Sequence, residues 1–598
     1  MSTIGVALLA SLLTSATPPT GASAPIDVLV VAGPAAAPEP GPAPEPAPSP
    51  EPDIVEPEPE PGPALDEDEP TPLPELEDEP DEEEEPGEED GDLTLDDIFG
   101  TADDHVNVRE GPTDDADGSA PGGLGLRGRR QMWENLDTRV RVISSAYYDV
   151  HRTEKRQFGR NENRLEFSFT YTPNKHLQIV GNLKAVFFGV AQAQELDDLA
   201  TQQMLTPFHF ESDAAYIALI DVLPHLDIKI GRQVLVWGTA DKFNPTNNIS
   251  PDDLEDRPLF TEPIGNQMIV VDYAPLANKL WFQGVYVPIF FPALLPPSAS
   301  AALRDPRAPV PFARQSDQRK LEAAQNVFAT NPMLVPDVEG RVQMPPRRFT
   351  DGQSAIKVGT SLGGIDMTVS YYNGRHDIPT PIDVRSEFKE DADGSDEGCC
   401  VRAVATLAYP RMQVIGADFA TQLPFLRNMG LWGEGGLFFP KPQEIFIEFP
   451  QPYDVTPDDP TDAPVTFLRG PTIRSRPFIK ATAGLDYTFG KHVYVQAQYV
   501  RGFIDDFGAG HIGNYVVGGT DLIFFGRHLI LRLFGVVDVP NKGDSASYVI
   551  FPALMVTPPW GSTTLELGSF FLLGPPDTKF GQPAAGTSIV FFKVTGTF

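Results

Sequence analysis

Segments in which apolar and polar side chains alternate recur along most of this chain. In one of them Leu165, Phe167 and Phe169 alternate with Glu166 and Ser168. The same pattern appears near residues 138–150, 226–237, 365–372, 479–488, 492–499, 528–538, 561–573 and 587–598. Successive side chains of an extended strand point to opposite faces, so each segment would form a strand with one apolar and one polar face. The chain is therefore predicted to be all-β.

The first 24 residues predict that the chain is exported. An apolar run from Ile4 to Leu13 is followed by Ala-Ser-Ala at positions 22–24, which is typical of a signal-peptide cleavage site. The run is too short to cross a bilayer. The only two cysteines, Cys399 and Cys400, are adjacent, so an exported chain of this size lacks a disulfide framework to stabilise it.

Many alternating segments in an exported chain without disulfides favour a membrane barrel over a soluble sandwich. In such a barrel the apolar face of each strand meets lipid and the polar face meets an enclosed interior. No apolar run reaches the ~20 residues that a spanning helix needs. We therefore predict a closed antiparallel transmembrane β-barrel over residues 126–598, surrounded by the outer-membrane lipids of a Gram-negative bacterium.

The lengths of the connecting segments predict about 18 strands, within a range of roughly 16–20. Barrels of this class have short turns and both chain ends on the periplasmic side, and long loops outside. Short turns within 171–180 and 487–496 are assigned to the periplasmic rim, with Tyr171 and Tyr487 in the aromatic belt. The long segments near 151–162, 191–212, 239–264, 292–353, 374–401, 441–474, 503–513, 540–546 and 575–586 are then outer loops. This count requires residues 402–423 to cross the membrane once, with Pro410 at a bulge or at the start of the strand.

The chain ends inside an alternating segment, at Phe598. A closed barrel needs its last strand, because that strand pairs with the first and leaves no edge in lipid. Phe592, Val594 and Phe598 resemble the C-terminal signal read by the bacterial barrel-assembly machinery, although Gly596 stands where an aromatic residue is common. These residues are therefore predicted to form the assembly signal.

A segment rich in proline and glutamate, residues 25–125, separates the signal peptide from the predicted barrel. About 33 acidic residues and one arginine fall between positions 25 and 120, so this segment carries most of the net charge of −39. With few aliphatic side chains to bury, it is predicted to be disordered and to lie in the periplasm. Within it, residues 91–100 are either a chance apolar patch or a docking motif for a periplasmic partner. The chain has no basic stripe, which argues against nucleic acid as a partner.

Two motifs resemble a family of porin-like outer-membrane barrels whose members are uncharacterised. Residues 228–257 contain a Gly-Arg-Gln strand end, a Trp-Gly pair and a long loop rich in Asn, Pro and Asp. The matching residues are Gly231, Arg232, Gln233, Trp237, Gly238, Asn244, Pro245 and Asp253. Residues 409–423 resemble a second characteristic strand of that family. The resemblance covers most of 126–598 and implies transport, since the family is associated with exporters of hydrophobic molecules, but it does not fix a solute.

The sequence carries no catalytic motif of a known class, so neither an enzyme nor a cofactor is predicted. Its 9 histidines are scattered without the spacing of metal ligands. Asp391, Asp393 and Glu397 offer oxygen ligands at alternate positions, as calcium loops do. The calcium-loop pattern is incomplete, so a solvated acidic loop tip is the favoured interpretation and these three residues remain only a metal candidate.

Charged residues inside the predicted strands are expected to face the lumen, because Arg or Lys at the membrane midplane costs about 2–4 kcal/mol. These residues are Arg164, Glu166, Asp227, Lys229, Lys480, Asp486, Arg501, Arg532 and Lys593. They would line a wet pathway or fill the lumen as ion pairs. The apolar loop 288–353 would narrow the mouth, offer an apolar entrance, or pack on the rim.

These features predict a channel or transporter for small or hydrophobic molecules across the outer membrane. The alternative is a non-conducting barrel that holds the acidic segment in the periplasm, where the segment recruits or spaces a partner.

Overall fold

The computed structural model describes residues 135–598 apart from 152–156, 193–196, 255–261, 277–278, most of 297–335, 389–400, 449–466, 541–544, 577 and 583–584. The signal peptide and the acidic segment lie outside the described residues. So do the candidate metal ligands Asp391, Asp393 and Glu397, and the pair Cys399 and Cys400.

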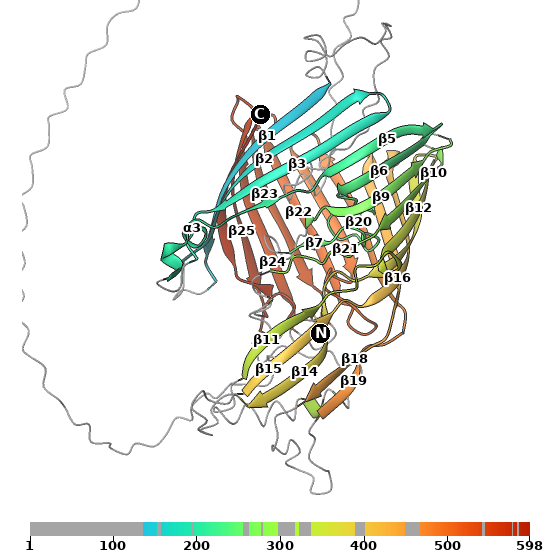
Figure 1. Ribbon diagram of the computed structural model, residues 1–598. Coiled ribbons are helices and arrows are strands. Elements are labelled where there is room, and N and C mark those ends of the chain that lie inside the picture. Colours follow the sequence, from blue (N-terminus) through green and yellow to red (C-terminus); the bar gives the residue numbers. More distant parts are fainter. Residues whose placement is uncertain are drawn as a thin grey trace, which may run out of the picture. The chain divides into compact units, whose positions relative to one another are not determined.

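A single sheet of 19 strands forms most of the described chain (Figure 1). The strands are β1 (Leu136–Asp149), β2 (Gln157–Asn174), β3 (Leu177–Phe188), β4 (Phe208–Glu211), β5 (Ala215–Leu223), β6 (Leu226–Gln233), β9 (Asn266–Tyr273), β10 (Trp281–Val287), β12 (Gln353–Leu362), β13 (Ile365–Arg375), β16 (Arg411–Leu423), β17 (Met429–Pro440), β20 (Phe478–Phe489), β21 (Val493–Arg501), β22 (Asn514–Phe524), β23 (Leu529–Asp538), β24 (Ser547–Val556), β25 (Thr563–Leu573) and β26 (Ile589–Thr597). Nine of these strands coincide with the alternating segments identified in the sequence, namely β1, β2, β6, β13, β20, β21, β23, β25 and β26.

The sheet closes into a barrel because its last strand pairs with its first. β26 runs antiparallel to β1, with Ile589 opposite Asp149 at one end of the ladder and Thr597 opposite Arg141 at the other. Beyond this ladder the backbones of Phe598 and Val140 exchange two hydrogen bonds, of 2.8 and 2.9 Å. The predicted closed antiparallel barrel is confirmed.

Two of the strands are parts of one membrane crossing. β3 pairs with β5 over Leu177–Gly181 and with β4 over Lys184–Phe187, so β4 continues the line of β5. Counting these two as one gives 18 crossings, which is the predicted number. Residues 402–423 cross once, and Pro410 comes directly before β16, as one of the two expected arrangements requires.

Short turns connect the strands at one end of the barrel and long loops at the other. The turn between β2 and β3 and that between β12 and β13 each span two residues, 175–176 and 363–364. The long loops are 150–156, 189–207, 234–265, 288–352, 376–410, 441–477, 502–513, 539–546 and 574–588. Tyr171, Tyr487, and both ends of the barrel chain lie at the short-turn end.

Three of the long loops together build a second, five-stranded sheet (Figure 1). Its strands, in spatial order, are β11 (Pro336–Gln343), β15 (Val401–Ala408), β14 (Thr380–Phe388), β18 (Gln443–Glu448) and β19 (Phe467–Ile473). Its most deeply buried residues include Val384, Ala403, Ala405, Ile445 and Ile447. The apolar period-two pattern of 402–408 thus serves this loop sheet and not the barrel.

The remaining elements are short: η3 (Asp197–Ala200), α3 (Gln202–Leu205), η6 (Phe349–Asp351), η7 (Pro424–Leu426), β7 (Asp252–Asp253) and β8 (Glu262–Pro263). Within the described part of the chain, no helix has the length and apolar character to cross a membrane.

The two faces of the barrel strands differ in chemistry. The outward face exposes large apolar side chains on nearly every strand, among them Leu165, Phe167, Leu183, Ile217, Ile230, Ile356, Val369, Ile415, Ile479, Leu533 and Phe592. The inward face buries charged side chains, among them Glu166, Lys184, Lys357, Asp418, Glu434, Lys480, Asp521 and Arg532. An exterior of this kind requires lipid around it, so the barrel is a membrane protein.

Candidate functional site

The segment that follows β6, residues 234–254, folds into the lumen and is called here the inward loop. The indole Nε1 of Trp237 donates to Gln283 on β10 at 2.6 Å. Thr482 on β20 donates to the carbonyl of Phe243 at 2.8 Å, and Gln496 on β21 donates to Asp241. A loop that contacts the inward faces of strands so far apart in the sheet can only lie inside the barrel.

Glu434, on β17, holds the inward loop by both carboxylate oxygens. Its Oε1 accepts hydrogen bonds from the backbone N–H and the hydroxyl of Thr246, each 2.7 Å long. Its Oε2 accepts the backbone N–H groups of Thr239 and Ala240 at 3.0 and 3.2 Å. The carboxylate is buried, and four donors offset the free energy of removing it from water.

Glycines let the inward loop approach the wall this closely. Gly238 has a φ of +109°, and a Cβ there would lie 2.3 Å from Oε2 of Glu434. On the wall, a Cβ at Gly416 would lie 2.5 Å from the side chain of Thr246. A Cβ at Gly436 would lie 3.2 Å from the carbonyl oxygen of Pro245. The Trp-Gly and Asn-Pro motifs therefore form the part of the loop that packs on the wall.

Two further loops enter the lumen and are joined by an ion-pair cluster. Lys579, from the 574–588 loop, pairs with Asp505 and with Asp506, whose Oδ1 lies 3.1 Å away. Lys480 on β20 donates to the carbonyl of Phe503 at 2.9 Å, and so holds the 502–513 loop to the wall. Burial lowers the pKa of Lys579, but the two carboxylates outweigh burial and raise it above the ordinary value, so this lysine stays charged.

Aromatic rings from these loops, from β22 and from the inward loop cluster around Phe503. The Phe503 ring lies 5.1 Å from that of Phe243, 5.0 Å from that of Tyr515 and 5.8 Å from that of Phe580. The rings continue an apolar wall, which we define as the buried lumen-facing residues Val500, Tyr515, Val517, Phe534, Val536, Val549, Phe551, Phe570, Leu572 and Phe591 of β21–β26. One side of the lumen is thus apolar and aromatic.

The side formed by β1–β3 is charged, and we call it the polar wall. Arg141 lies 3.4 Å from Glu166, and Arg164 lies 2.8 Å from Glu162 and 3.7 Å from Glu166. On β3, Lys184 pairs with Asp213. These charges compensate one another at short range, so the polar wall has weak preference for ions of either sign.

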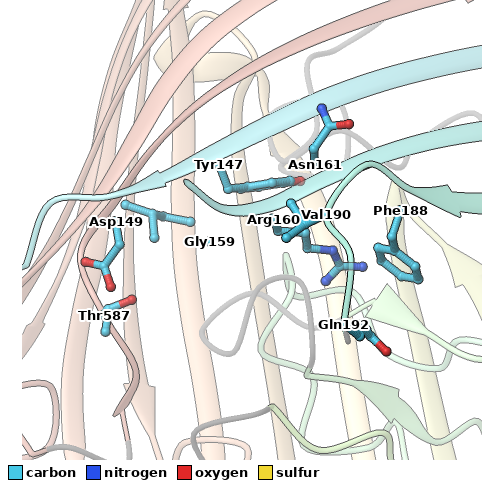
Figure 2. Close-up of a pocket in the computed structure, with 10 residues that line it drawn as sticks. Tyr147, Asp149, Gly159, Arg160, Asn161, Phe188, Val190, Gln192 and Thr587 are labelled. Atoms are coloured by element: carbon cyan, nitrogen blue, oxygen red, sulfur yellow. The ribbon is translucent and has the colours of Figure 1, made fainter. Parts of the chain in front are cut away.

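A cavity of about 380 Å³, the mouth cavity, lies at the long-loop end of β1–β3 beside the 574–588 loop. The Arg160 guanidinium lies 5.3 Å from the centre of the Phe188 ring and pairs with Glu162. Figure 2 shows Arg160 and Phe188 projecting to one side of their strands and Asn161 to the other. The Tyr147 ring lies 5.8 Å from that of Phe591, so the cavity joins the polar wall to the apolar wall.

A cavity of about 60 Å³ lies beside the inward loop and is lined by Pro245, Arg375, His376, Asp377 and Lys480, among others. Burial is the main reason that the pKa of His376 falls to about 4, and the charge of Lys480 lowers it further, against the opposing effect of Asp377. His376 is therefore neutral at pH 7, and its Nδ1 accepts the backbone N–H of Ile378 at 3.0 Å.

The residues predicted to line the lumen fall on the inward face with one exception. Arg164, Glu166 and Lys480 have the contacts described above. Lys229 lies 3.4 Å from Asp272, and Asp486 accepts from the Tyr494 hydroxyl at 3.3 Å. Asp227 accepts the backbone N–H of Asp221, Arg532 pairs with Asp521, and Lys593 lies opposite Glu566.

Arg501 is the exception, and its predicted place in the lumen is wrong. It shares the exposed face of β21 with Tyr499, while Val500 and Gln498 are buried on the other face. Its guanidinium donates to Asn514 at 3.1 Å, at the loop end of the barrel. The cost of a lipid-facing charge falls towards the membrane surface, so a residue at a strand end can carry Arg outward.

The sequence did not single out Glu434, Asp418, Lys357 or Asp521. Each is a charged residue within a strand, the same signal that identified the predicted lumen residues. Glu434 also stands among four glycines, at 430, 433, 435 and 436, and such a charge in a glycine-rich strand indicates that another backbone approaches it.

The assembly residues lie at the closing seam. Phe592 and Phe598 are exposed on the outward side, and Val594 shares the outward face of β26 with Phe592. Within the described ranges, no group of three or more His, Cys, Asp and Glu side chains is arranged to hold a metal ion.

No protein-family model and no curated protein matches the sequence. Among solved structures, the chain is similar to Acinetobacter baumannii OccAB1, with 8% identity, a TM-score of 0.41, and coverage of 78% of this chain and 96% of that one. It is similar to Pseudomonas aeruginosa OpdK with vanillate at 10% identity and a TM-score of 0.40, covering 77% and 98% of the two chains. It is similar to Pseudomonas aeruginosa OpdL at 8% identity and a TM-score of 0.41, covering 78% of this chain and 99% of that one.

Proposed function

We propose that the protein is an outer-membrane channel for small molecules that combine an apolar body with a polar group. The observation that carries this proposal is the mouth cavity, where a charged strand face meets an aromatic one. Its volume, about 380 Å³, is that of a site for one small organic molecule. The ring of Phe188 and the guanidinium of Arg160 offer such a molecule apolar and polar contacts within one cavity.

The filled lumen supports a narrow, selective path. The inward loop and the 502–513 and 574–588 loops are fastened to the wall by buried hydrogen bonds and ion pairs, at Glu434, Lys480 and Lys579. Loops fastened in this way leave room for small solutes and exclude large ones. The aromatic side of the lumen agrees with the resemblance to barrels associated with exporters of hydrophobic molecules.

The orientation follows from the ends of the barrel chain. Both lie at the short-turn end, which faces the periplasm in barrels of this class. We therefore place the acidic segment 25–125 in the periplasm. A pure anchor for this segment, the alternative function, would have no use for cavities lined by both charged and aromatic residues.

Solute flux into liposomes tests the proposal. Liposomes containing the full-length protein are expected to swell in short-chain aryl or alkyl acids and alcohols of up to about 300 Da, and to exclude oligosaccharides several times larger. Phe188→Ala together with Arg160→Ala should slow entry of the amphipathic solutes more than that of glycerol. Liposomes that do not swell in any of these solutes would contradict the proposal and favour the anchor.

A further inference from the structure

One part of the barrel wall is not closed by backbone hydrogen bonds among the described residues. β4 pairs with β3, with Phe208 opposite Phe187 and Glu211 opposite Lys184, and its other edge has no strand paired to it in the described ranges. β6, which pairs with β5 as far as Arg232, would be its neighbour but ends at Gln233, where the chain turns into the lumen. On the far side β9 begins only at Asn266.

A backbone contact and one side chain close the end of this gap next to Ser212 and Asp213. Gly265 packs directly on Asp213, since a Cβ at that glycine would lie 2.3 Å from the Asp213 carbonyl oxygen. Arg232, on the outward face of β6, donates to the carbonyl of Ser212 and so satisfies a backbone group at the end of the free edge. The same guanidinium lies 5.4 Å from the centre of the Phe291 ring.

Beside these contacts lies a cavity of about 560 Å³, the portal cavity, which is lined by residues from both faces of the wall. Its lining includes Leu183 and Phe210, which are 50% and 62% exposed on the lipid-facing side. It also includes Arg164 and Lys184, which belong to the polar wall of the lumen, and Val234 at the start of the inward loop. Leu183 and Lys184, neighbouring residues of one strand, point to opposite faces of the wall, and both line this cavity, which therefore lies at the gap between the two faces.

The portal cavity lies within the lipid layer. At ~3.4 Å per residue and a strand tilt of ~40°, Leu183 lies about 16 Å and Phe187 about 26 Å above the short-turn end of β3. The apolar band of such barrels is about 25 Å tall, so the cavity opens into the outer half of the membrane. The lining residue Phe210 belongs to an aromatic cluster: the Phe208 ring lies 6.1 Å from that of Phe210 and 6.2 Å from that of Phe187.

We propose that the portal cavity is a lateral opening through which small amphipathic molecules pass between the outer leaflet and the lumen. The apolar body of such a molecule would contact Leu183, Phe210 and Phe291, and its polar group would reach the charged residues Arg164 and Lys184. The proposal extends the proposed function, because it names the route by which an apolar solute avoids crossing bulk water. The proposed opening rests on the geometry of the gap and can be tested whether or not the lumen conducts.

Labelling of single cysteines by a membrane-dissolved reagent tests the opening. In the full-length protein with Cys399→Ser and Cys400→Ser, one cysteine is placed at Val234 in the portal cavity. Controls carry it at Leu531, which faces lipid, or at Gln192, which lines the mouth cavity. N-dodecylmaleimide partitions into the bilayer, and a sulfonated maleimide stays in water.

The dodecyl reagent is expected to label Val234→Cys at a rate within about tenfold of that for Leu531→Cys, and at least about tenfold faster than Gln192→Cys, because its concentration is high only in lipid. The sulfonated reagent should label Gln192→Cys and leave Leu531→Cys unmodified. If the dodecyl reagent labels Val234→Cys no faster than Gln192→Cys, it arrives through water and the opening is overturned.

A second test blocks the proposed opening with a larger side chain. Leu183→Trp places a large ring at the outer mouth of the portal cavity and is expected to slow dodecyl labelling of Val234→Cys at least about tenfold. Leu165→Trp, on the same outward face but outside the cavity lining, should leave the rate unchanged. Equal rates in the two tryptophan variants contradict the opening.

Ion currents recorded from the same proteins separate this proposal from the channel itself. If the protein gives currents but the dodecyl reagent does not label Val234→Cys, the lateral opening is overturned and the channel function still holds. Rapid labelling of Val234→Cys in a protein without currents supports the opening and contradicts the channel.

Discussion

Thr246 gives both its backbone N–H and its hydroxyl to one oxygen of Glu434, each at 2.7 Å. The two residues are 188 positions apart, and the contact fixes the inward loop to the wall of the barrel. The lumen is therefore shaped by a loop that donates four hydrogen bonds to one buried carboxylate of the wall.

Removal of these hydrogen bonds should loosen the inward loop in proportion to the number lost. Thr246→Val loses one bond to the carboxylate, which corresponds to about 1–2 kcal/mol and a roughly tenfold rise in amide exchange over 237–248. Glu434→Gln places an amide NH₂ against the N–H groups of Thr239 and Ala240, so exchange should rise further, by about a hundredfold. Glu566→Gln, on the lumen face of β25 away from this loop, is the matched control. Exchange that is equal in all three variants would contradict the role given to Glu434.

Loss of one partner of the Arg532–Asp521 ion pair should destabilise the barrel more than replacement of both partners. Arg532 Nε and Nη2 donate to the two oxygens of Asp521 at 2.9 and 2.7 Å, and both side chains are fully buried. Asp521→Asn leaves a buried charge uncompensated and should lower stability to denaturant by about 3–5 kcal/mol. The double change Asp521→Leu with Arg532→Met should restore most of the loss. A double variant as unstable as the single one would show that the charges themselves are required.

Acidification should release the loop that follows β13. The pKa of His376 is about 4 in the folded chain and near 6.5 when unfolded, so the unfolded loop binds more protons between these values. Stability contributed by neutral His376 is thus complete above pH 6.5 and is lost as the pH falls. The loss between pH 7 and pH 5 should be about 2 kcal/mol.

Hydrogen exchange of residues 376–388, corrected for intrinsic rates, measures this effect. His376→Asn keeps an acceptor for the Ile378 N–H but cannot be protonated, so its exchange protection should not change between pH 7 and pH 5. Protection that falls equally in the wild type and in His376→Asn would assign the pH dependence to another group.

Removal of the last side chain should impair assembly more than stability. Phe598 is exposed at the closing seam, and its backbone already pairs with Val140. Phe598→Ala keeps that backbone pairing, yet the fraction of protein in folded, heat-modifiable form in outer membranes should fall several-fold. Thr597→Ala, the neighbouring residue on the inward face, is the control. Equal assembly of the two variants would show that the terminal aromatic is not read as a signal.

The barrel could be predicted because lipid imposes one rule on every strand. The alternation at Leu165, Phe167 and Phe169 is repeated strand after strand, and an odd number of crossings would have placed long loops on both sides. The same parity predicted a single crossing in 402–423, which β16 confirms. The loop sheet could not be predicted, because the alternation of 401–408 has the same period as a barrel strand.

The arrangement of the loops in the lumen could not be predicted from the sequence, for a different reason. Contacts such as those of Glu434 with Thr239 and of Lys579 with Asp506 join loops that are far apart along the chain, and no local pattern encodes their partners. The rule that charges face inward holds where lipid is thickest and weakens at strand ends. Arg501, at the last position of β21, shows where that rule stops.

Single-channel recording in planar bilayers tests the central claim, that the lumen narrowed by the inward loop is a conducting path. The wild-type protein is predicted to give discrete, small current steps, and Glu434→Gln steps at least about twofold larger and noisier, because the freed loop widens the path. Glu566→Gln should behave as the wild type. A silent wild-type protein, or currents unchanged by Glu434→Gln, would contradict the account.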